Sequence, residues 1–213
     1  MAERLKNTKA DLVLGIPRGG VVVARQVADE LDLPLDIVVT RKIGAPGQEE
    51  LALGAVDPDG EVVWDEALLT QLDLSTGGLE LRIKEEREEL ERREKLYRQG
   101  RKPLDVENKT VILVDDGMAT GSTTLAAVKY LKRHGAKVIL AIPVASQEAL
   151  DKVTSELASH PERGDSRVEG SRFGVNKVIV LEIPEYFQAV GQFYYEFLPV
   201  LDEEVIQLLT RKE

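Results

Sequence analysis

The chain has 213 residues, of which 43% are hydrophobic and 31% charged, and its formal net charge is −10. This length and composition predict one soluble, folded domain with a sizeable core. The acidic excess argues against a nucleic-acid partner, the lack of cysteine excludes disulfides and thiol chemistry, and without an apolar run of about 18 residues or an N-terminal signal we expect a cytoplasmic protein with no membrane partner.

The N-terminal part of the chain predicts a strand, a helix and a second strand. Residues 11–16 form an apolar run of strand length, and the sequence Pro-Arg-Gly-Gly at 17–20 ends it. Residues 21–31 have helical spacing, and residues 35–40 have the pattern of another strand. A strand–helix–strand unit of this kind is right-handed and places its strands parallel.

The next segment predicts a loop followed by a hairpin. Residues 41–50 contain two glycines, a proline and few apolar side chains, which favours a loop. Residues 51–56 and 61–64 flank the turn Asp-Pro-Asp-Gly at 57–60. This pattern is typical of two short antiparallel strands.

Residues 79–98 predict a long and heavily charged helix, because opposite charges recur four residues apart in the favourable orientation. We interpret it as a solvent-exposed helix, and a homodimer contact through its narrow apolar stripe is the alternative. The stripe consists of Leu79, Ile83, Leu90 and Tyr97.

The remaining chain continues the alternation of strands and helices. Asp202 is the expected cap of the last helix, and the polar, glycine-rich residues 160–174 predict a loop or an insertion. The expected strands are 111–114, 137–143 and 177–183, and the expected helices begin after residue 121 and cover 147–157 and 202–209.

This alternation predicts an α/β fold with a central, mostly parallel sheet flanked by helices. We expect a single domain over residues 1–213, with a core at about 9–158 and a small hood built from C-terminal segments at about 177–200.

The most informative feature is the sequence VILVDDGMATGSTT at 111–124. Its apolar run ends in two adjacent carboxylates, Asp115 and Asp116, and a small, hydroxyl-rich turn leads into a helix. Backbone N–H groups at a helix N-terminus bind phosphate. Carboxylates accept hydrogen bonds from sugar hydroxyls, directly or through a metal and its waters. The pattern therefore predicts a sugar-phosphate site; a simple helix cap after a buried strand is the alternative.

Residues 111–123 resemble the signature with which type I phosphoribosyltransferases bind 5-phosphoribosyl pyrophosphate (PRPP). Nearly the whole chain is similar to a bacterial and archaeal branch of that family, through the motifs IPRGG, RKIGAPG, DDGMATG and PE-x-F-x-AVG-x-x-Y in this order. The resemblance implies the type I fold and an Mg²⁺-dependent transfer of 5-phosphoribose from PRPP to a nitrogenous base, with release of pyrophosphate.

The resemblance also implies roles for individual residues. Asp115 and Asp116 are expected to hold the ribose hydroxyls and, through substrate or water, Mg²⁺. Lys42, with Arg41 second, is expected to stabilise the departing pyrophosphate from a flexible loop; a solvated basic pair is the alternative. The residues expected to bind the phosphates of PRPP are Arg18, Gly19, Gly20, Gly117, Met118, Ala119, Thr120, Gly121, Ser122 and Thr123.

In the same family the pair corresponding to Pro17 and Arg18 often carries a cis peptide bond; an ordinary tight turn with a surface arginine is the alternative. Family members that act on hypoxanthine or guanine usually have an aspartate where this chain has Ala119. The alanine resembles adenine and uracil enzymes and disfavours a 6-oxopurine acceptor.

The base is expected under the hood, where aromatic side chains could stack on a planar ring. The candidates are Tyr186, Phe187, Phe193 and Tyr194, for which a small hydrophobic core is the alternative. Two other functions remain open: a non-enzymatic regulator that binds PRPP or a nucleotide, and a hydrolase or phosphorylase of ribose phosphates. The resemblance also makes a homodimer plausible.

Overall fold

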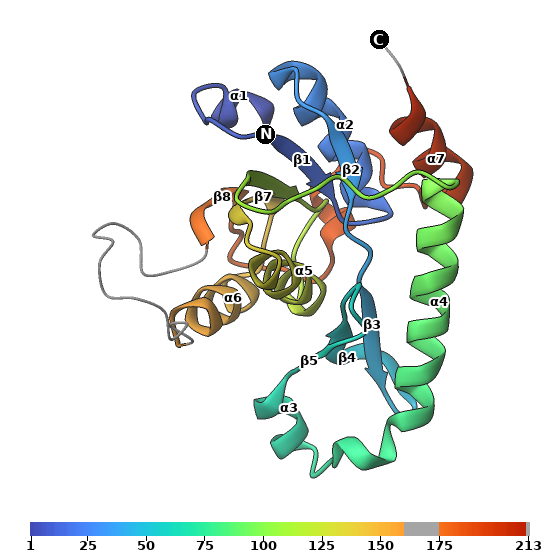
Figure 1. Ribbon diagram of the computed structural model, residues 1–213. Helices are drawn as coiled ribbons and strands as arrows, with labels where there is room; N and C mark the ends of the chain where they lie inside the picture. The colour runs from blue at the N-terminus through green and yellow to red at the C-terminus, as the bar shows by residue number, and fades with distance from the viewer. Residues whose placement is uncertain (160–174, 212–213) are drawn as a thin grey trace, which may run out of the picture.

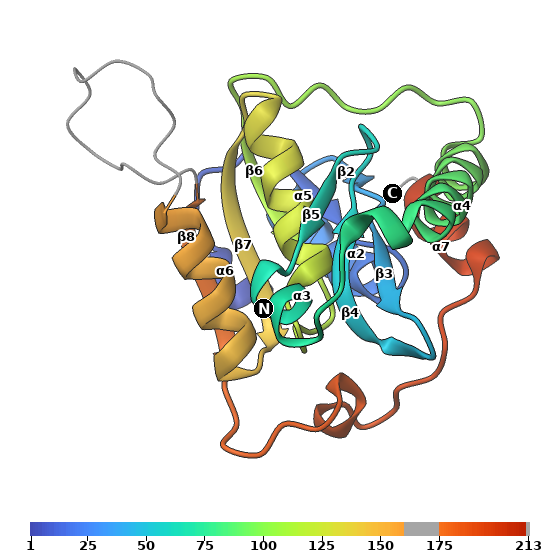
Figure 2. The ribbon, with the colours of Figure 1, turned by 90° about the horizontal axis from the view of Figure 1, so that it is seen from below.

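The computed structural model describes residues 1–159 and 175–211, and a five-stranded parallel sheet forms its centre (Figures 1 and 2). The strand order is β2-β1-β6-β7-β8, and all four strand pairs are parallel. The predicted α/β fold with a mostly parallel sheet is therefore confirmed. The strands are β1 (Leu12–Gly15), β2 (Leu35–Ile37), β6 (Thr110–Val114), β7 (Lys137–Val144) and β8 (Val175–Glu182).

Helices cover both faces of this sheet. Successive side chains of a strand point to opposite faces, so Ile112 and Val114 of β6 pack with α2, whereas Val111 and Leu113 pack with α5 and α6. Burial on both faces explains why these strands are continuous apolar runs. The helices around the sheet are α1 (Ala2–Leu5), α2 (Gly19–Leu31), α5 (Ser122–Arg133) and α6 (Gln147–Ser159).

A second, antiparallel sheet contains β3 (Arg41–Ala45), β4 (Gln48–Val56) and β5 (Val62–Trp64). The predicted hairpin of β4 and β5 is confirmed, but the loop expected at 41–50 is wrong. Gly44 is the reason, since a Cβ there would lie 2.5 Å from the Glu49 carbonyl oxygen. The glycine permits a close strand contact with irregular register rather than marking a loop.

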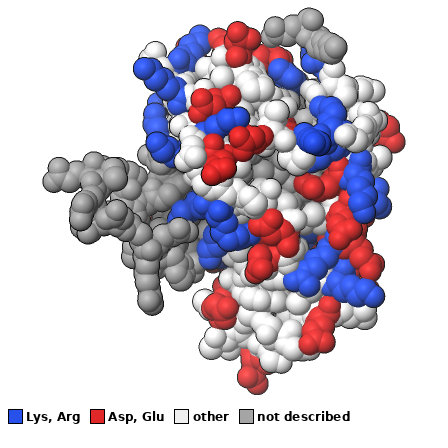
Figure 3. All heavy atoms as spheres, viewed as in Figure 1, with Lys and Arg blue, Asp and Glu red and all other residues white. Residues whose placement is uncertain are grey.

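The charged helix α4 (Glu80–Arg98) stands beside the second sheet (Figure 1). Leu90 and Tyr97 are buried together with Ile43 of β3, so the apolar stripe packs inside the chain and is not a dimer contact. Acidic and basic side chains are interspersed on the outer face of α4 (Figure 3). This confirms a surface helix. Two short helices, α3 (Glu66–Gln71) and η1 (Thr76–Gly78), lead from β5 to α4.

The C-terminal segment leaves β8, passes through η2 (Val190–Phe193) and ends in α7 (Asp202–Thr210), which packs on α2 and α4 (Figures 1 and 2). Residues 177–182 belong to the central sheet, so the segment left to form a hood begins at residue 183. The expectation that Asp202 caps α7 is wrong, because Leu201 is the N-cap residue. The Asp202 carboxylate instead accepts a hydrogen bond of 2.6 Å from the Tyr97 hydroxyl. The stretch 160–174 lies outside the described residues.

Candidate active site

Two loops meet at the carboxyl end of the central sheet, after the neighbouring strands β1 and β6. A Cβ on Gly20 would lie 2.8 Å from the Asp115 Cα, and one on Gly19 would lie 1.8 Å from the Asp116 Oδ2. A side chain at Gly20 would meet backbone, and one at Gly19 would displace the Asp116 carboxylate, so the IPRGG loop and the acidic pair are in direct contact. The expected cis peptide bond is present between Pro17 and Arg18.

The acidic pair is largely withdrawn from solvent. Asp115 is 8% exposed, and its Oδ1 accepts a 2.9 Å hydrogen bond from the Asp116 N–H. Burial, with the neighbouring Asp116 carboxylate, raises the pKa of Asp115 well above its usual range, and burial also raises the pKa of Asp116. A cation or hydroxyl donors beside the pair would offset the cost of its charge.

The described ranges contain no group of three or more histidine, cysteine or acidic side chains arranged to hold a metal. A divalent ion at Asp115 and Asp116 would therefore complete its coordination with water or substrate oxygens, as Mg²⁺ commonly does.

The turn that the sequence predicts to bind phosphate, called the phosphate turn below, lies at the start of α5. Gly121 is the N-cap residue with a φ of 75°, and Ala119 and Thr120 are exposed beside it. The first N–H groups of the helix have no partner within it, and they attract anions. Met118 differs from the expectation, because its side chain is buried in the core and both its backbone groups bond to β7 and Ser146.

Sequence reasoning missed two residues that follow the edge of β7. Ser146 donates its hydroxyl to the Ala119 carbonyl at 2.8 Å. The Lys152 ammonium lies 3.4 Å from the Ser122 Oγ and 2.6 Å from the Asp65 Oδ2. β7 is the strand next to β6, and the carboxyl ends of such strands are where ligands bind. That rule was the available signal for both residues.

The three basic residues that the sequence predicts for the site lie beside different elements of the fold. Arg18 lies 3.7 Å from Asp202 of α7. Arg41 donates to Glu86 of α4 at 2.7 Å, so its guanidinium is paired with the charged helix. Lys42 occupies the opposite face of β3, beside the residue of β4 that packs with α5. Of the two basic residues, Lys42 is therefore on the side of α5.

The C-terminal segment lies over the acidic pair. A Cβ on Gly117 would lie 2.4 Å from Val190 Cγ1, and the Tyr194 hydroxyl donates to the Asp116 carbonyl. Burial, followed by the charges of Asp116 and Asp115, raises the pKa of Tyr194 above its usual value.

The four aromatic candidates do not form one pocket. Phe187 and Phe193 stack on each other with ring centroids 5.5 Å apart, and Tyr186 is 86% exposed. Tyr194 is the aromatic residue that the structure brings to the acidic pair.

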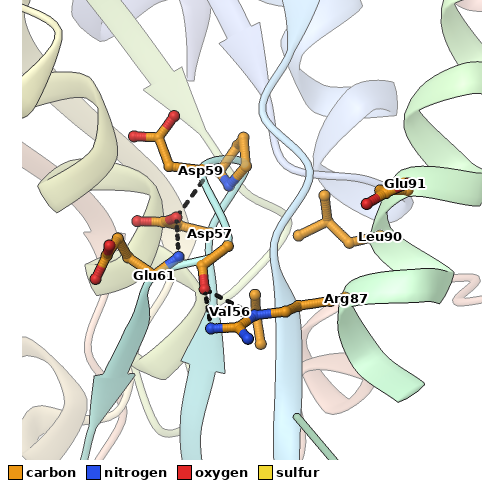
Figure 4. Close-up of a pocket in the computed structure, with 9 residues that line it drawn as sticks. Val56, Asp57, Asp59, Glu61, Arg87, Leu90 and Glu91 are labelled. Atoms are coloured by element: carbon orange, nitrogen blue, oxygen red, sulfur yellow. Dashed lines mark hydrogen bonds between the residues drawn. The ribbon is translucent and has the colours of Figure 1, made fainter. Parts of the chain in front are cut away.

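A separate hollow with a volume of 360 Å³ lies between α4 and the turn after β4 (Figure 4). Arg87 crosses it and donates through Nε to the Gly60 carbonyl at 2.9 Å. The turn pairs with Arg133 and His134 at the C-terminal end of α5. The phosphate turn is at the other end of this 12-residue helix, about 18 Å away, so the hollow is a different place from the candidate site.

No helix in residues 1–159 or 175–211 combines the length and apolar character that a membrane crossing requires. Residues 1–165 match the family described as the phosphoribosyl transferase domain. Two Mycobacterium tuberculosis proteins, from different strains and both named as candidate phosphoribosyl transferases, are 36% identical over 214 residues. These matches cover 99% of this chain and 44% of each relative, so the chain spans less than half the length of these relatives.

The crystal structure of TT1426 from Thermus thermophilus is similar over 98% of this chain and 91% of that protein. The sequence identity is 38% and the TM-score is 0.73.

Proposed function

Because this chain belongs to the family of phosphoribosyl transferase domains, we propose that it is an enzyme that transfers 5-phosphoribose from PRPP to a nitrogenous base. The observation that supports this most is the contact of Gly19 and Gly20 with the carboxylates of Asp115 and Asp116, next to the phosphate turn. It supports the proposal because the IPRGG loop touches the two acidic residues that precede the N-terminus of α5.

The 5-phosphate binds in the turn of residues 119–123. The backbone N–H groups of this turn and the hydroxyls of Thr120 and Thr123 donate to its oxygens, and the dipole of α5 favours its negative charge. The ribose then lies over Asp115 and Asp116, whose oxygens accept hydrogen bonds from its hydroxyls.

In the reaction, the bond between the anomeric carbon and the pyrophosphate oxygen breaks, and pyrophosphate leaves with the electron pair. A ring nitrogen of the base donates its lone pair to the same carbon, and the proton of that nitrogen passes to the departing pyrophosphate or to water. The sugar becomes positively charged in the transition state, as in glycoside cleavage, and the carboxylates of Asp115 and Asp116 oppose that charge. Arg18 and Lys42 stabilise the leaving group.

The site fits Mg²⁺, because Asp115 and Asp116 offer adjacent, hard oxygen donors whose buried charge a cation would offset. When bound, the ion supplies charge neutralisation for the departing pyrophosphate. The Asp115 and Asp116 side chains bind the sugar and align its anomeric carbon.

The acceptor that we propose is a base of the adenine or uracil type. Ala119 offers no carboxylate to take a proton from a 6-oxopurine. Tyr194 of the C-terminal segment donates to the Asp116 carbonyl, which supports an approach of the base to the sugar beside this side chain. We also propose that the protein is cytoplasmic and acts as a homodimer. Sedimentation velocity tests the homodimer, which should appear as a species of twice the chain mass.

The test measures pyrophosphate release with PRPP, Mg²⁺ and a panel of purine and pyrimidine bases. We expect release with at least one base and its loss in the variant D115N/D116N. The control E203Q/E204Q removes two adjacent, exposed carboxylates on α7 and should leave release unchanged.

A regulator that binds PRPP without turnover is the second candidate, favoured by the missing carboxylate at position 119. Tight PRPP binding without release for any base would support the regulator, and no binding at all would overturn both proposals.

A further inference from the structure

Lys152 lies behind the phosphate turn, on a helix that the proposed reaction does not use. Its ammonium is 2.6 Å from the Asp65 Oδ2 and 3.4 Å from the Ser122 Oγ. The Ser122 Oγ is in turn 3.5 Å from the Thr120 Oγ1, whose side chain is exposed at the turn. A polar path therefore runs from Asp65 at the start of α3, through Lys152, to the proposed phosphate site.

The helix that carries Lys152 is fixed against this turn. A Cβ on Gly121 would lie 2.9 Å from Val153 Cγ2 and 3.2 Å from the Ala149 carbonyl oxygen. Ser146 adds a second attachment, because its hydroxyl donates to the Ala119 carbonyl and accepts from the Ala149 N–H at 3.0 Å. The backbone of α6 is therefore packed against the turn, whereas the Lys152 side chain has a flexible stem.

Asp65 is held independently of Lys152. Its Oδ1 accepts the Leu68 N–H at 3.0 Å and caps α3. Partial burial opposes the ionisation of Asp65, but the hydrogen bonds from Lys152 and Leu68 outweigh it and leave the pKa below its usual value. Both side chains of the ion pair are about one-fifth exposed, at 21% and 20%, so an anion from solvent can compete for the ammonium.

The larger charge of a phosphate lets it compete with the Asp65 carboxylate for the Lys152 ammonium. A phosphate monoester carries a charge of about −1.5 to −2 near neutral pH, and the donors of the turn itself are neutral. The acidic pair is nearby, so a dianion in the turn needs a cation to offset repulsion. Arg18, the cation of the neighbouring loop, is oriented toward Asp202.

We propose that Lys152 is a phosphate-binding residue of this site, and that Asp65 competes with the ligand for it and so sets the affinity. Binding of a ribose 5-phosphate group draws the ammonium from Asp65 to the phosphate. This inference rests on the proposed function, since it assumes that the turn binds a sugar phosphate.

The test measures binding of ribose 5-phosphate by calorimetry to the full chain and three variants. K152M keeps the apolar stem and should weaken binding about tenfold, the loss of one charge-assisted hydrogen bond. D65N keeps an oxygen to cap α3 and should tighten binding about threefold, because the competing charge is gone. The control K95M breaks an exposed ion pair with Glu91 on α4 and should change nothing.

A second measurement follows the ³¹P shift of bound ribose 5-phosphate against pH. An adjacent ammonium favours the dianion, so the second pKa of the bound phosphate should be higher in K152M than in the wild type. A merely structural role for Lys152 would leave this pKa unchanged.

The outcomes separate this inference from the proposed function. If T123V loses ribose 5-phosphate but K152M binds it normally, Lys152 has no such role while the phosphate turn stands. Weaker binding by D65N overturns the competition, and this result does not depend on whether K152M folds. If the wild type binds neither ribose 5-phosphate nor PRPP, both proposals fail.

Discussion

The contact between Gly117 and Val190 determines how closely the C-terminal segment covers the acidic pair. A Cβ on Gly117 would lie 2.4 and 2.6 Å from the two Val190 methyl groups, far inside normal contact. Gly117 is not among the glycines with positive φ, so an alanine at this position causes a steric clash without backbone strain. Overpacking of this kind costs about 1–3 kcal/mol. The variant G117A should therefore push the segment away from Asp116.

The second substitution V190A removes both methyl groups and leaves Val190 Cβ as the nearest atom, at 3.0 Å. Val190 is half-buried, so V190A alone costs about 1 kcal/mol or less. The double variant G117A/V190A should hold the segment better than G117A does, which is a favourable coupling of about 1 kcal/mol.

Hydrogen exchange read by mass spectrometry measures this effect. The reporters are the amides of Gln192 and Tyr194, which donate to carbonyls of Ala189 and Gly191 around η2. In G117A these amides should exchange faster by a factor of about 5 to 150. In the double variant G117A/V190A part of the protection should return. G77A is the control, because no atom lies within 4 Å of its added Cβ. Unchanged exchange in G117A, or a double variant no better protected, would refute the packing argument.

Two further predictions concern stability. R98M leaves the largely buried Asp36, to which Arg98 donates at 2.7 and 2.8 Å, without its charge partner, and should cost about 3–5 kcal/mol in urea unfolding; a cost below about 1 kcal/mol would show the ion pair to be dispensable. Burial and the bond to Asp202 raise the pKa of Tyr97 to about 12. The neutral phenol stabilises the fold below about pH 10, and this contribution is lost as the pH rises through about 12. At about pH 11 the wild type should have lost about 1.4 kcal/mol more than Y97F has, relative to about pH 8, and equal losses would contradict the shift.

The central part of the fold could be predicted because it depends on local patterns. The strands at 11–16 and 111–114 are buried on both faces, so their apolar runs are unambiguous. Once they are parallel neighbours, the loops that follow them must meet at one edge. The approach of Gly19 and Gly20 to the acidic pair follows from that topology.

The remaining features depend on contacts that residue type does not reveal. Gly44 is a residue type common in loops, but it lies in strand β3, where Glu49 of β4 packs against it. Arg41 pairs with Glu86, 45 residues later in the chain. Lys152 meets Asp65 across 87 residues, and no local pattern predicts that the two side chains pair.

The aromatic C-terminal segment has no such periodicity, so composition alone could not separate Tyr194, which meets Asp116, from Tyr186, which faces solvent.

A crystal structure of the protein with PRPP and Mg²⁺ tests the central claim most directly. The account predicts the 5-phosphate in the turn of residues 119–123 and the ribose hydroxyls within about 2.5–3.0 Å of Asp115 or Asp116 oxygens. A phosphate bound elsewhere, or a ribose out of reach of both carboxylates, would contradict it.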